Sequence, residues 1–257
     1  MVKVLEIKIY SNAIRNVIEE ILDIIKTDRK KNYCISATGA HGIIYSKKEK
    51  IFKEVLNSFH INLPDGMPIV WIGRLKGERE MDRCYGPDFF RELIVGTKGK
   101  AINHYFCGGK ENIANELKTV CREKLGNDNI VGTFSPPFRE MSDEELIVLA
   151  KEIDEKHADI VWIGLSTPKQ EIFAYRLSRY THVHFLCTVG AAFDFHTGKV
   201  IQAPKLIQRT GLEWLFRLIT EPRRLWKRYF EIVPKFIYYN LQELVQYVFS
   251  KLVKEKQ

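Results

Sequence analysis

Short apolar runs that stop at glycine or threonine alternate with longer helix-like stretches, and this alternation constrains the fold more than any other feature of the chain. The runs are Tyr33–Ala37, Ile102–Cys107, Asn129–Phe134, Asp159–Leu165 and His184–Val189. Apolar residues recur at helical spacing in residues 12–26, 51–57, 111–125, 142–157 and 168–180. Strands that alternate with helices in this way predict an α/β fold, a Rossmann-like, mostly parallel sheet covered by helices.

The character of the chain changes at Pro204. Residues 204–257 contain almost no glycine and carry a net charge of +6, whereas residues 1–203 carry only +2 of the total +8. One helical stripe of this region is apolar, formed by Val233, Ile237, Leu241, Leu244, Val248 and Leu252. Pro222 and Pro234 are expected to divide the region into about three helical pieces. We therefore expect an α/β domain over residues 1–203 and a basic amphipathic helical appendage over residues 204–257.

Several classes of protein do not fit the composition. The cysteines form no CxxC pair and their number is odd, so a reducing compartment is expected. The short, charged N-terminus is not expected to be a signal peptide, and no apolar run approaches the length of a spanning helix. His182, His184 and His196 lie close in sequence, but their spacing completes no ligand set, so no metal site is expected. No two Asp residues are separated by one residue, so the Asp-x-Asp signature of metal-dependent sugar transferases is absent.

Glycines and polar residues gather where the predicted strands end. The clusters are Thr38-Gly39, Gly108-Gly109-Lys110, Gly132-Thr133, Gly164 to Glu171, and Gly190 with the following Asp194. In open α/β sheets, ligands bind beyond the carboxyl ends of the strands, and glycine lets the backbone approach them closely. The clusters together favour a nucleotide site, although each glycine alone can end a strand for steric reasons. Neither a GxGxxG nor a GxxxxGK[ST] motif is present.

Two local motifs suggest chemistry but also have plain structural interpretations. Pro168 fits the first position of a helix, which would place Lys169 and Gln170 in its first turn, facing phosphate or sugar oxygens. The same residues also suit an ordinary helix start. Asp65 lies in a Pro-Asp-Gly turn and could act as a general base. The local sequence alone favours the turn interpretation, because Asp in such turns bonds its own backbone.

The tail offers cations at helical spacing. Arg217, Arg224 and Arg228 recur at intervals of seven and four, with Lys227 beside them. Trp214 and Trp226 suit a membrane interface, and the basic residues suit anionic lipid or a diphosphate. A solvated basic face, or a helix pair that docks a partner, remains the alternative.

Taken in order, these motifs resemble the WecG/TagA/CpsF glycosyltransferases over about Ile35 to Tyr229. The resemblance rests on Asp65-Gly66 before an apolar run, Arg83 with Gly86 and Asp88, and Gly164-x-x-x-Pro168-Lys169-Gln170-Glu171. It also rests on Val189 to Phe195 with Gly198 and Ala203-Pro204, and on Gly211-Leu212-Glu213-Trp214 with Glu221-Pro222.

The resemblance implies metal-independent, inverting transfer from a UDP-sugar to a polyprenyl-diphosphate-linked sugar, in surface polysaccharide or teichoic-acid-type synthesis. It implies no cofactor and a peripheral location at the cytoplasmic face of the membrane. Asp65 becomes the expected base, which reverses the turn interpretation, and Thr38 and Gln170 are expected to line the pocket. The expected substrate-binding residues are Arg83, Gly108, Gly132, Gly164, Lys169, Gly190, Asp194, Arg217, Arg224, Lys227 and Arg228.

The sequence departs from the family pattern at two places, and these leave the donor sugar open. Ala40, followed by His41, stands where the family often has Asn, and Pro136-Pro137-Phe138 stands where it often has Gly-Tyr-Phe. The alternative function is a non-catalytic, membrane-recruited scaffold that binds a nucleotide sugar. An epimerase or dehydrogenase would need a dinucleotide motif, and a nucleic-acid binder would leave the glycine clusters unexplained. Exposed apolar residues of the tail suit either membrane or a homo-oligomer.

Overall fold

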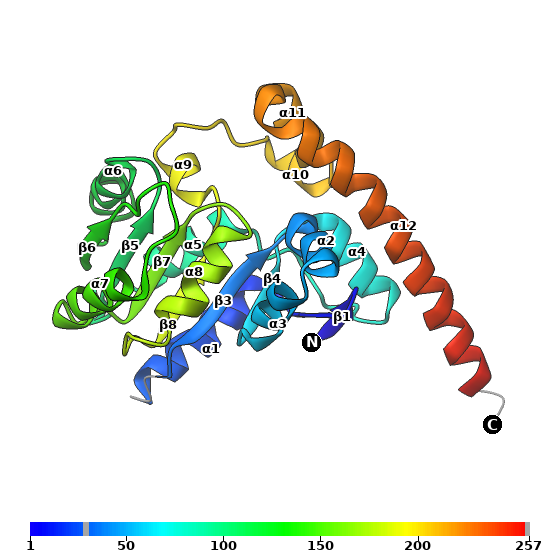
Figure 1. Cartoon of the computed structure of the whole chain (residues 1–257), viewed down its shortest axis with the longest axis horizontal. Helices are drawn as coiled ribbons and strands as arrows, with labels where there is room; N and C mark the ends of the chain where they lie inside the picture. Colours follow the sequence, from blue (N-terminus) through cyan, green and yellow to red (C-terminus); the bar gives the residue numbers. More distant parts are fainter. Residues whose placement is uncertain (28–30, 255–257) are drawn as a thin grey trace.

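The computed structural model describes residues 1–27 and 31–254, with side chains up to residue 248. Its centre is a six-stranded sheet in the order β4-β3-β8-β7-β5-β6, in which every pairing is parallel (Figure 1). The strands are β3 (Tyr33–Thr38), β4 (Ile61–Pro64), β5 (His104–Gly108), β6 (Ile130–Phe134), β7 (Ile160–Gly164) and β8 (Phe185–Thr188). This sheet confirms the α/β, Rossmann-like fold.

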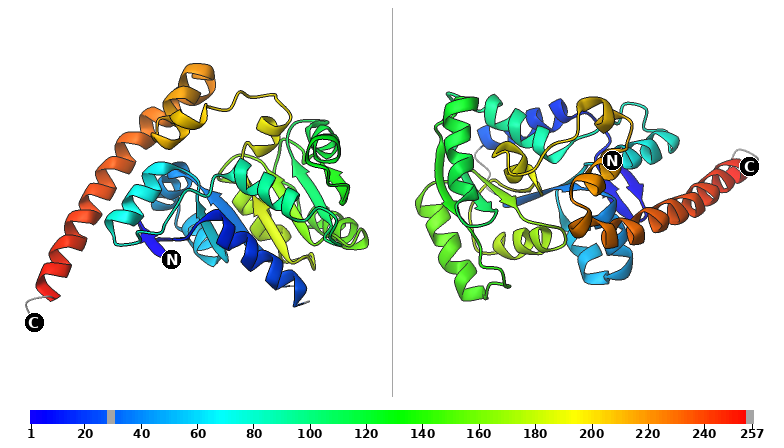
Figure 2. Two further views of the ribbon diagram at one scale, coloured as in Figure 1. Left: turned by 180° about the vertical axis from the view of Figure 1, so that it is seen from behind. Right: turned by 90° about the horizontal axis from the view of Figure 1, so that it is seen from above.

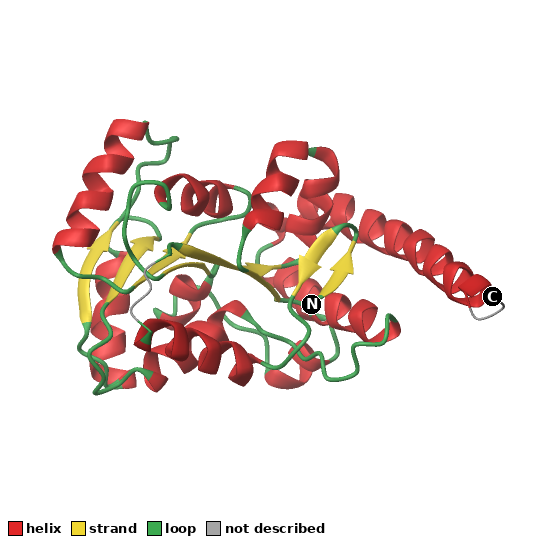
Figure 3. Ribbon diagram, turned by 90° about the horizontal axis from the view of Figure 1, so that it is seen from below, coloured by secondary structure: helices red, strands yellow, loops and turns green. Residues whose placement is uncertain are grey.

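Helices cover both faces of the sheet (Figure 3). One face carries α1 (Ile14–Lys26), α5 (Gly86–Gly96), α6 (Ile113–Val120) with the π-helical turn η1 (Cys121–Leu125), and α9 (Ala192–His196). The other face carries α3 (Lys50–Ser58), α7 (Asp143–Glu155) and α8 (Lys169–Leu177). Successive strand residues point to opposite faces, so Trp162 packs in the first cluster while Val161 and Ile163 pack in the second. Burial on both faces explains why the strands read as continuous apolar runs.

Several elements were not predicted from the sequence. An antiparallel hairpin forms from β1 (Val2–Val4) and β2 (Ile7–Ile9). The strand β3 is followed by α2 (Ala40–Lys48), and β4 is followed by α4 (Met67–Leu75). The short apolar run Ile69–Ile72 therefore lies inside a helix, which Pro68 opens from its first turn.

The region after Pro204 is helical, consisting of α10 (Lys205–Arg209), α11 (Glu213–Thr220) and α12 (Pro222–Lys254). Pro222 begins α12, as its missing N–H allows. The prediction that the helix breaks at Pro234 is wrong, because α12 continues through that residue. Pro234 is exposed, so water can reach the carbonyl that its missing N–H leaves without a partner. Within the described residues, no helix has the length and apolar character needed to cross a membrane.

The long helix α12 is held along the body by one face (Figure 2). Ile232 and Phe236 are buried in a cluster with the β1–β2 hairpin, α2 and α4. Glu243 accepts the backbone N–H of Leu5 at 3.1 Å and pairs with the nearly buried Lys76. The apolar stripe singled out from the sequence, which begins at Val233, is a different face and does not enter this cluster. The Leu252 side chain of that stripe lies outside the described residues.

Candidate active site

A cavity of about 1480 Å³ lies beyond the carboxyl ends of the sheet. The segments that follow β3, β4, β7 and β8 form one side of it, and α11 and α12 contribute the opposite side. In a parallel sheet all carboxyl ends meet at one edge, so residues far apart in sequence converge there. Expected site residues that line the cavity are Asp65, Arg83, Gly164, Lys169, Gln170, Gly190, Asp194, Arg217, Arg224 and Arg228.

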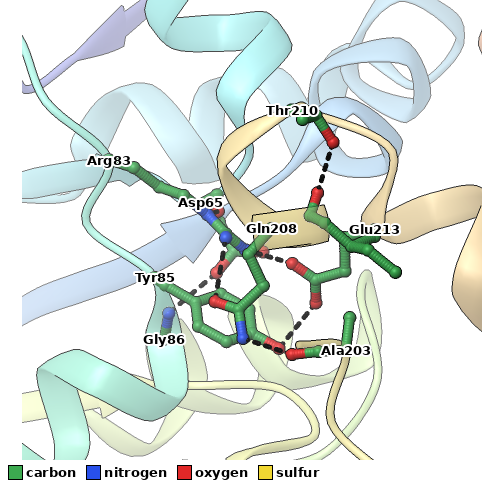
Figure 4. A network of polar contacts seen from close by, with 9 residues as sticks. Asp65, Arg83, Tyr85, Gly86, Ala203, Gln208, Thr210 and Glu213 are labelled. Atoms are coloured by element: carbon green, nitrogen blue, oxygen red, sulfur yellow. Dashed lines mark hydrogen bonds and ion pairs between the residues drawn. The ribbon is translucent and has the colours of Figure 1, made fainter. Parts of the chain in front are cut away.

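Asp65 follows β4 directly and lies on the cavity wall (Figure 4). Its Oδ1 accepts a hydrogen bond from the backbone N–H of Gly86 at 2.8 Å, and Oδ2 lies toward Gly39. Burial raises the pKa of Asp65 to about 6, while Arg83 and the Gly86 N–H oppose the rise. A carboxylate with this pKa is ionised at neutral pH and is a stronger base than an exposed Asp.

Gly86 is needed where α5 begins. A Cβ added to Gly86 would lie 2.9 Å from the carbonyl oxygen of Val189 and 3.1 Å from the Cβ of Ala37. Only a residue without a side chain therefore brings its N–H this close to the Asp65 carboxylate. The glycine at position 86 is therefore explained by the lack of space for a side chain and by the hydrogen bond from its N–H to Asp65.

An ion pair joins the loop after α4 to the start of α11 (Figure 4). The Arg83 guanidinium contacts the Glu213 carboxylate, and both side chains are nearly buried. Arg83 Nε also donates to the carbonyl oxygen of Asp65 at 2.6 Å. The Tyr85 hydroxyl donates to Glu213 Oε1 at 2.7 Å, and Arg83 lies 4.0 Å from the Tyr85 ring centroid. We call these three side chains the Arg83–Glu213–Tyr85 junction.

The junction changes the expectation for Arg83 and adds residues that sequence reasoning missed. Arg83 was expected to face ligand, but Glu213, the Asp65 carbonyl and Gln208 Oε1 engage its donors. Glu213 and Tyr85 were assigned no role, although Glu213 lies in the Gly-Leu-Glu-Trp motif. The only local signal for Glu213 is its place in the first turn of a helix, which any capping acid shares.

A second polar network holds the loop after β8. Gln170 is buried, its Oε1 accepts the N–H of Gly190 at 3.0 Å, and its Nε2 donates to Glu171 Oε1 at 2.9 Å. Burial raises the pKa of Glu171, whose Oε1 also accepts a hydrogen bond from the Thr167 hydroxyl at 2.8 Å.

Thr38 is buried beneath the cavity and is not among its lining residues. Its hydroxyl donates to Asn62 Oδ1 at 3.2 Å.

The expected glycines divide into two groups. Gly164 and Gly190 line the cavity, and Gly190 has a φ of +58° that favours glycine. Gly108 and Gly132 are not among the lining residues. A Cβ on Gly132 would lie 2.3 Å from the Tyr105 ring, and one on Gly108 would lie 2.6 Å from the Gly164 carbonyl oxygen. Close packing therefore explains these two.

Cations surround the cavity on the tail side. Arg217 and Arg224 both pair with Glu221, at 3.8 Å and 2.6 Å. Burial, together with the neighbouring arginines, lowers the pKa of Arg228. Arg217 also lies near the carboxylate of Glu213, and both arginines lie near that of Asp194. The cluster of three guanidiniums on this side suits a diphosphate. Lys227 is exposed and is not among the lining residues.

His182 and His196, two of the histidines considered for a metal site, contact different partners. His182 pairs with Asp154 at 2.9 Å, and His196 Nε2 lies 2.9 Å from the Pro87 carbonyl oxygen. Among the described residues, no group of three or more His, Cys, Asp or Glu side chains could hold a metal ion. His41 lines the cavity, and burial beside Arg228 lowers its pKa to about 4, so its imidazole is neutral at pH 7.

Comparison with known proteins covers both the sheet and the tail. The sequence model described as the glycosyl transferase WecG/TagA/CpsF family matches residues 2–248. The chain is 30% identical over 216 residues to the N-acetylglucosaminyldiphosphoundecaprenol N-acetyl-beta-D-mannosaminyltransferase of Bacillus subtilis (strain 168). That similarity covers 84% of this chain and 82% of the Bacillus protein.

Proposed function

Because the chain belongs to the WecG/TagA/CpsF family of glycosyltransferases, we propose that it moves a sugar from a UDP-sugar to a polyprenyl-diphosphate-linked sugar without a metal ion. The reaction is a direct displacement that inverts the anomeric carbon. The product belongs to a cell-envelope polymer of the surface polysaccharide or teichoic-acid type. The observation that carries the proposal is Asp65, a carboxylate with a pKa near 6 on the wall of the cavity.

Asp65 is the general base of this reaction. Its Oδ2 takes the proton of an acceptor hydroxyl while the hydroxyl oxygen forms a bond to the anomeric carbon. The bond between that carbon and the UDP oxygen breaks, and the electron pair leaves with the diphosphate. The Gly86 N–H holds Oδ1, so the carboxylate presents its other oxygen in a fixed direction.

Cationic side chains stabilise the leaving diphosphate. Lys169 begins α8 and lines the cavity on the sheet side, and Arg217 faces it from α11. Such fixed charges stabilise negative charge that develops in the transition state, which is the task that a divalent metal performs in other transferases. Gln170 positions the Gly190 loop through its hydrogen bond, and Thr38 supports the strand end from below.

The proposed acceptor is supported by the similarity to the Bacillus enzyme, and the proposed membrane location is supported by residues 204–257. The Bacillus enzyme, as its name states, acts on an N-acetylglucosaminyldiphosphoundecaprenol acceptor. Residues 1–203 form the catalytic domain in this proposal, and residues 204–257 form the appendage that associates with the cytoplasmic face of the membrane. The net charge of +6 on residues 204–257, together with Trp214 and Trp226, supports this location.

UDP release tests the proposal. The wild-type enzyme would be assayed in EDTA with a panel of UDP-sugars, including UDP-N-acetylmannosamine, with and without a polyprenyl-diphosphate-linked sugar. Asp65→Asn keeps an acceptor for the Gly86 N–H and should lower kcat by about 10² to 10⁴-fold, since a general base contributes that much. Asp82→Asn, an exposed acid outside the cavity, is the matched control and should retain activity.

Three outcomes would contradict parts of the proposal. Acceptor-dependent release that persists in Asp65→Asn would remove Asp65 as the base. Activity that is lost in EDTA and restored by added metal would refute the metal-free mechanism. Measurable UDP binding without turnover on any donor and acceptor pair would favour the scaffold function instead.

A further inference from the structure

The cavity continues away from Asp65 as an apolar groove between two helices. Its walls are one face of α4 and one face of α12. We call this part the α4–α12 groove, formed by Trp71, Ile72, Leu75, Val233, Ile237, Leu241 and Leu244. On α12 these residues recur at intervals of four and three, and on α4 Trp71 and Ile72 precede Leu75 by four and three positions, so each set lies on one side of its helix. The part of the tail stripe from Val233 to Leu244 thus lines a cavity rather than a core, whereas Val248 is not among the lining residues.

The groove leaves large apolar side chains uncovered. Leu75 is 67% exposed, and Ile237 and Leu241 are 54% and 58% exposed. Contacts outside the groove attach α12 to α2 and to the end of α4. Lys48 pairs with Glu231 at 2.9 Å, and Tyr247 donates to the Lys76 carbonyl oxygen at 2.9 Å. An apolar groove of this kind gains free energy when an apolar ligand covers it.

The chemistry of the cavity changes along its length. At one end lie Asp65 and the arginines of the tail, and at the other lies the α4–α12 groove. Arg228 precedes Val233 by five residues on α12, which is between one and two helical turns. A positive charge therefore lies at the end of the groove that is nearer to Asp65. A continuous site with a cationic end and an apolar end matches an amphiphile that has an anionic head and a hydrocarbon tail.

The position of the base indicates which end of a bound amphiphile would lie near Asp65. Asp65 is followed by Gly66, and α4 begins at Met67, so the base and one groove wall belong to one continuous segment. A chain lying in the groove therefore places its head group against Asp65. We propose that the α4–α12 groove binds the first isoprene units of the lipid-linked acceptor, and that Arg228 contacts the diphosphate of that acceptor. This inference rests on the proposed function.

Chain-length preference tests the inference. The full chain would be assayed with detergent below its critical micelle concentration, so that the acceptor chains start in water, and with acceptors that share one head group and differ only in a geranyl or a heptaprenyl chain. The wild-type kcat/KM should be at least about tenfold higher for the heptaprenyl acceptor, since a few buried methylenes suffice for that factor. The double variant Ile237→Gln with Leu241→Gln should lose this preference, because kcat/KM should fall by at least about tenfold more on the heptaprenyl acceptor than on the geranyl acceptor.

A matched control separates the groove from a general membrane contact. Phe230 and Val245 are 72% and 54% exposed on α12 and do not line the cavity. The double variant Phe230→Gln with Val245→Gln should keep the wild-type chain-length preference. Equal preference for both chains in the wild type would overturn the inference, as would an unchanged preference in the groove variant. Loss of the preference in the control variant would assign it to the membrane-facing surface instead.

Failure of the proposed function can be distinguished from failure of the groove inference by whether the wild type transfers sugar at all. A wild-type enzyme without transfer to either acceptor would remove the proposed reaction and leave the groove to be tested by binding. Farnesyl diphosphate titrated against the intrinsic fluorescence, with Trp71→Phe as the reference, provides that test. A saturable change that Trp71→Phe lacks would support the groove. Binding that Ile237→Gln with Leu241→Gln leaves unaltered would contradict it.

Discussion

Replacing Gly86 with alanine isolates the hydrogen bond that tunes the base. The new Cβ would lie 2.9 Å from the Val189 carbonyl oxygen and 3.1 Å from the Ala37 Cβ. Both neighbours belong to the sheet or its edge, so the start of α5 must move. That movement lengthens the 2.8 Å bond from the Gly86 N–H to Asp65 Oδ1. We therefore expect Gly86→Ala to weaken an interaction that is stronger with the ionised carboxylate than with the protonated acid.

The magnitude follows from that bond. A hydrogen bond to a charged group contributes about 1.5–3 kcal/mol. Because about 1.36 kcal/mol corresponds to a tenfold change in ionisation, its loss raises the pKa of Asp65 by about 1 to 2. The base must be deprotonated, so the acidic limb of the kcat/KM profile moves from about pH 6 toward higher pH. Activity at pH 7 should fall by about two- to tenfold.

The assay is the pH dependence of kcat/KM for the wild type and the variant. Gly96→Ala is the matched control, because Gly96 ends the same helix and a Cβ there meets no atom within 4 Å. Gly86→Ala should also lower the free energy of unfolding by about 1–3 kcal/mol through overpacking, while Gly96→Ala should not. An acidic limb that stays near pH 6 in a folded Gly86→Ala protein would refute the reasoning.

Three further predictions test the polar groups of the site and core. Glu213→Gln should shift the acidic limb of kcat/KM to lower pH, because the Glu213 charge raises the pKa of Asp65; an unchanged or higher limb would contradict this. Arg217→Gln should lower kcat by about 10- to 100-fold, whereas Lys227→Gln, outside the cavity lining, should change it less than about twofold in the UDP-release assay. Burial lowers the pKa of His104 to about 3, so between pH 6.5 and 3 the unfolded chain binds the extra proton and stability falls as pH falls. His104→Gln should therefore lose about 2 kcal/mol less than the wild type between pH 7 and pH 5 in urea titrations, and an equal loss would refute the assignment.

The sheet was predictable because parallel strands are buried on both faces and read as apolar runs. The strand β4 escaped prediction because Asn62 interrupts its run of apolar residues. In the structure Asn62 is buried, and its amide donates to the carbonyl oxygens of Lys8 and Leu56 at 3.1 Å and 2.8 Å. Those partners come from β2 and α3, so the reason for a polar residue at this position is tertiary. The break expected at Pro234 failed because local propensity says nothing about which side of a helix meets water.

The site was predictable as far as its residues follow strand ends. Asp65, Gln170 and Gly190 line one cavity because parallel strands share a carboxyl edge. Lys227 could not be separated from Arg228 by sequence, since their orientation depends on how α12 docks. The partnership of Arg83 with Glu213 joins residues 130 positions apart, and no periodicity reveals such a pair. The roles of these residues stay predictions that the kinetic tests above address.

The docking of α12 affects the order in which the chain folds during synthesis. Leu5 and Glu243 are separated by 238 positions, and the junction between Arg83 and Glu213 also closes late along the chain. During synthesis the ribosome releases the sheet long before these contacts can form, because distant contacts wait for the segments that make them. A nascent chain therefore carries Asp65 without Glu213 and without the tail arginines. Under the proposed mechanism, turnover therefore requires that α11 and α12 have docked, because they supply Glu213 and the tail arginines.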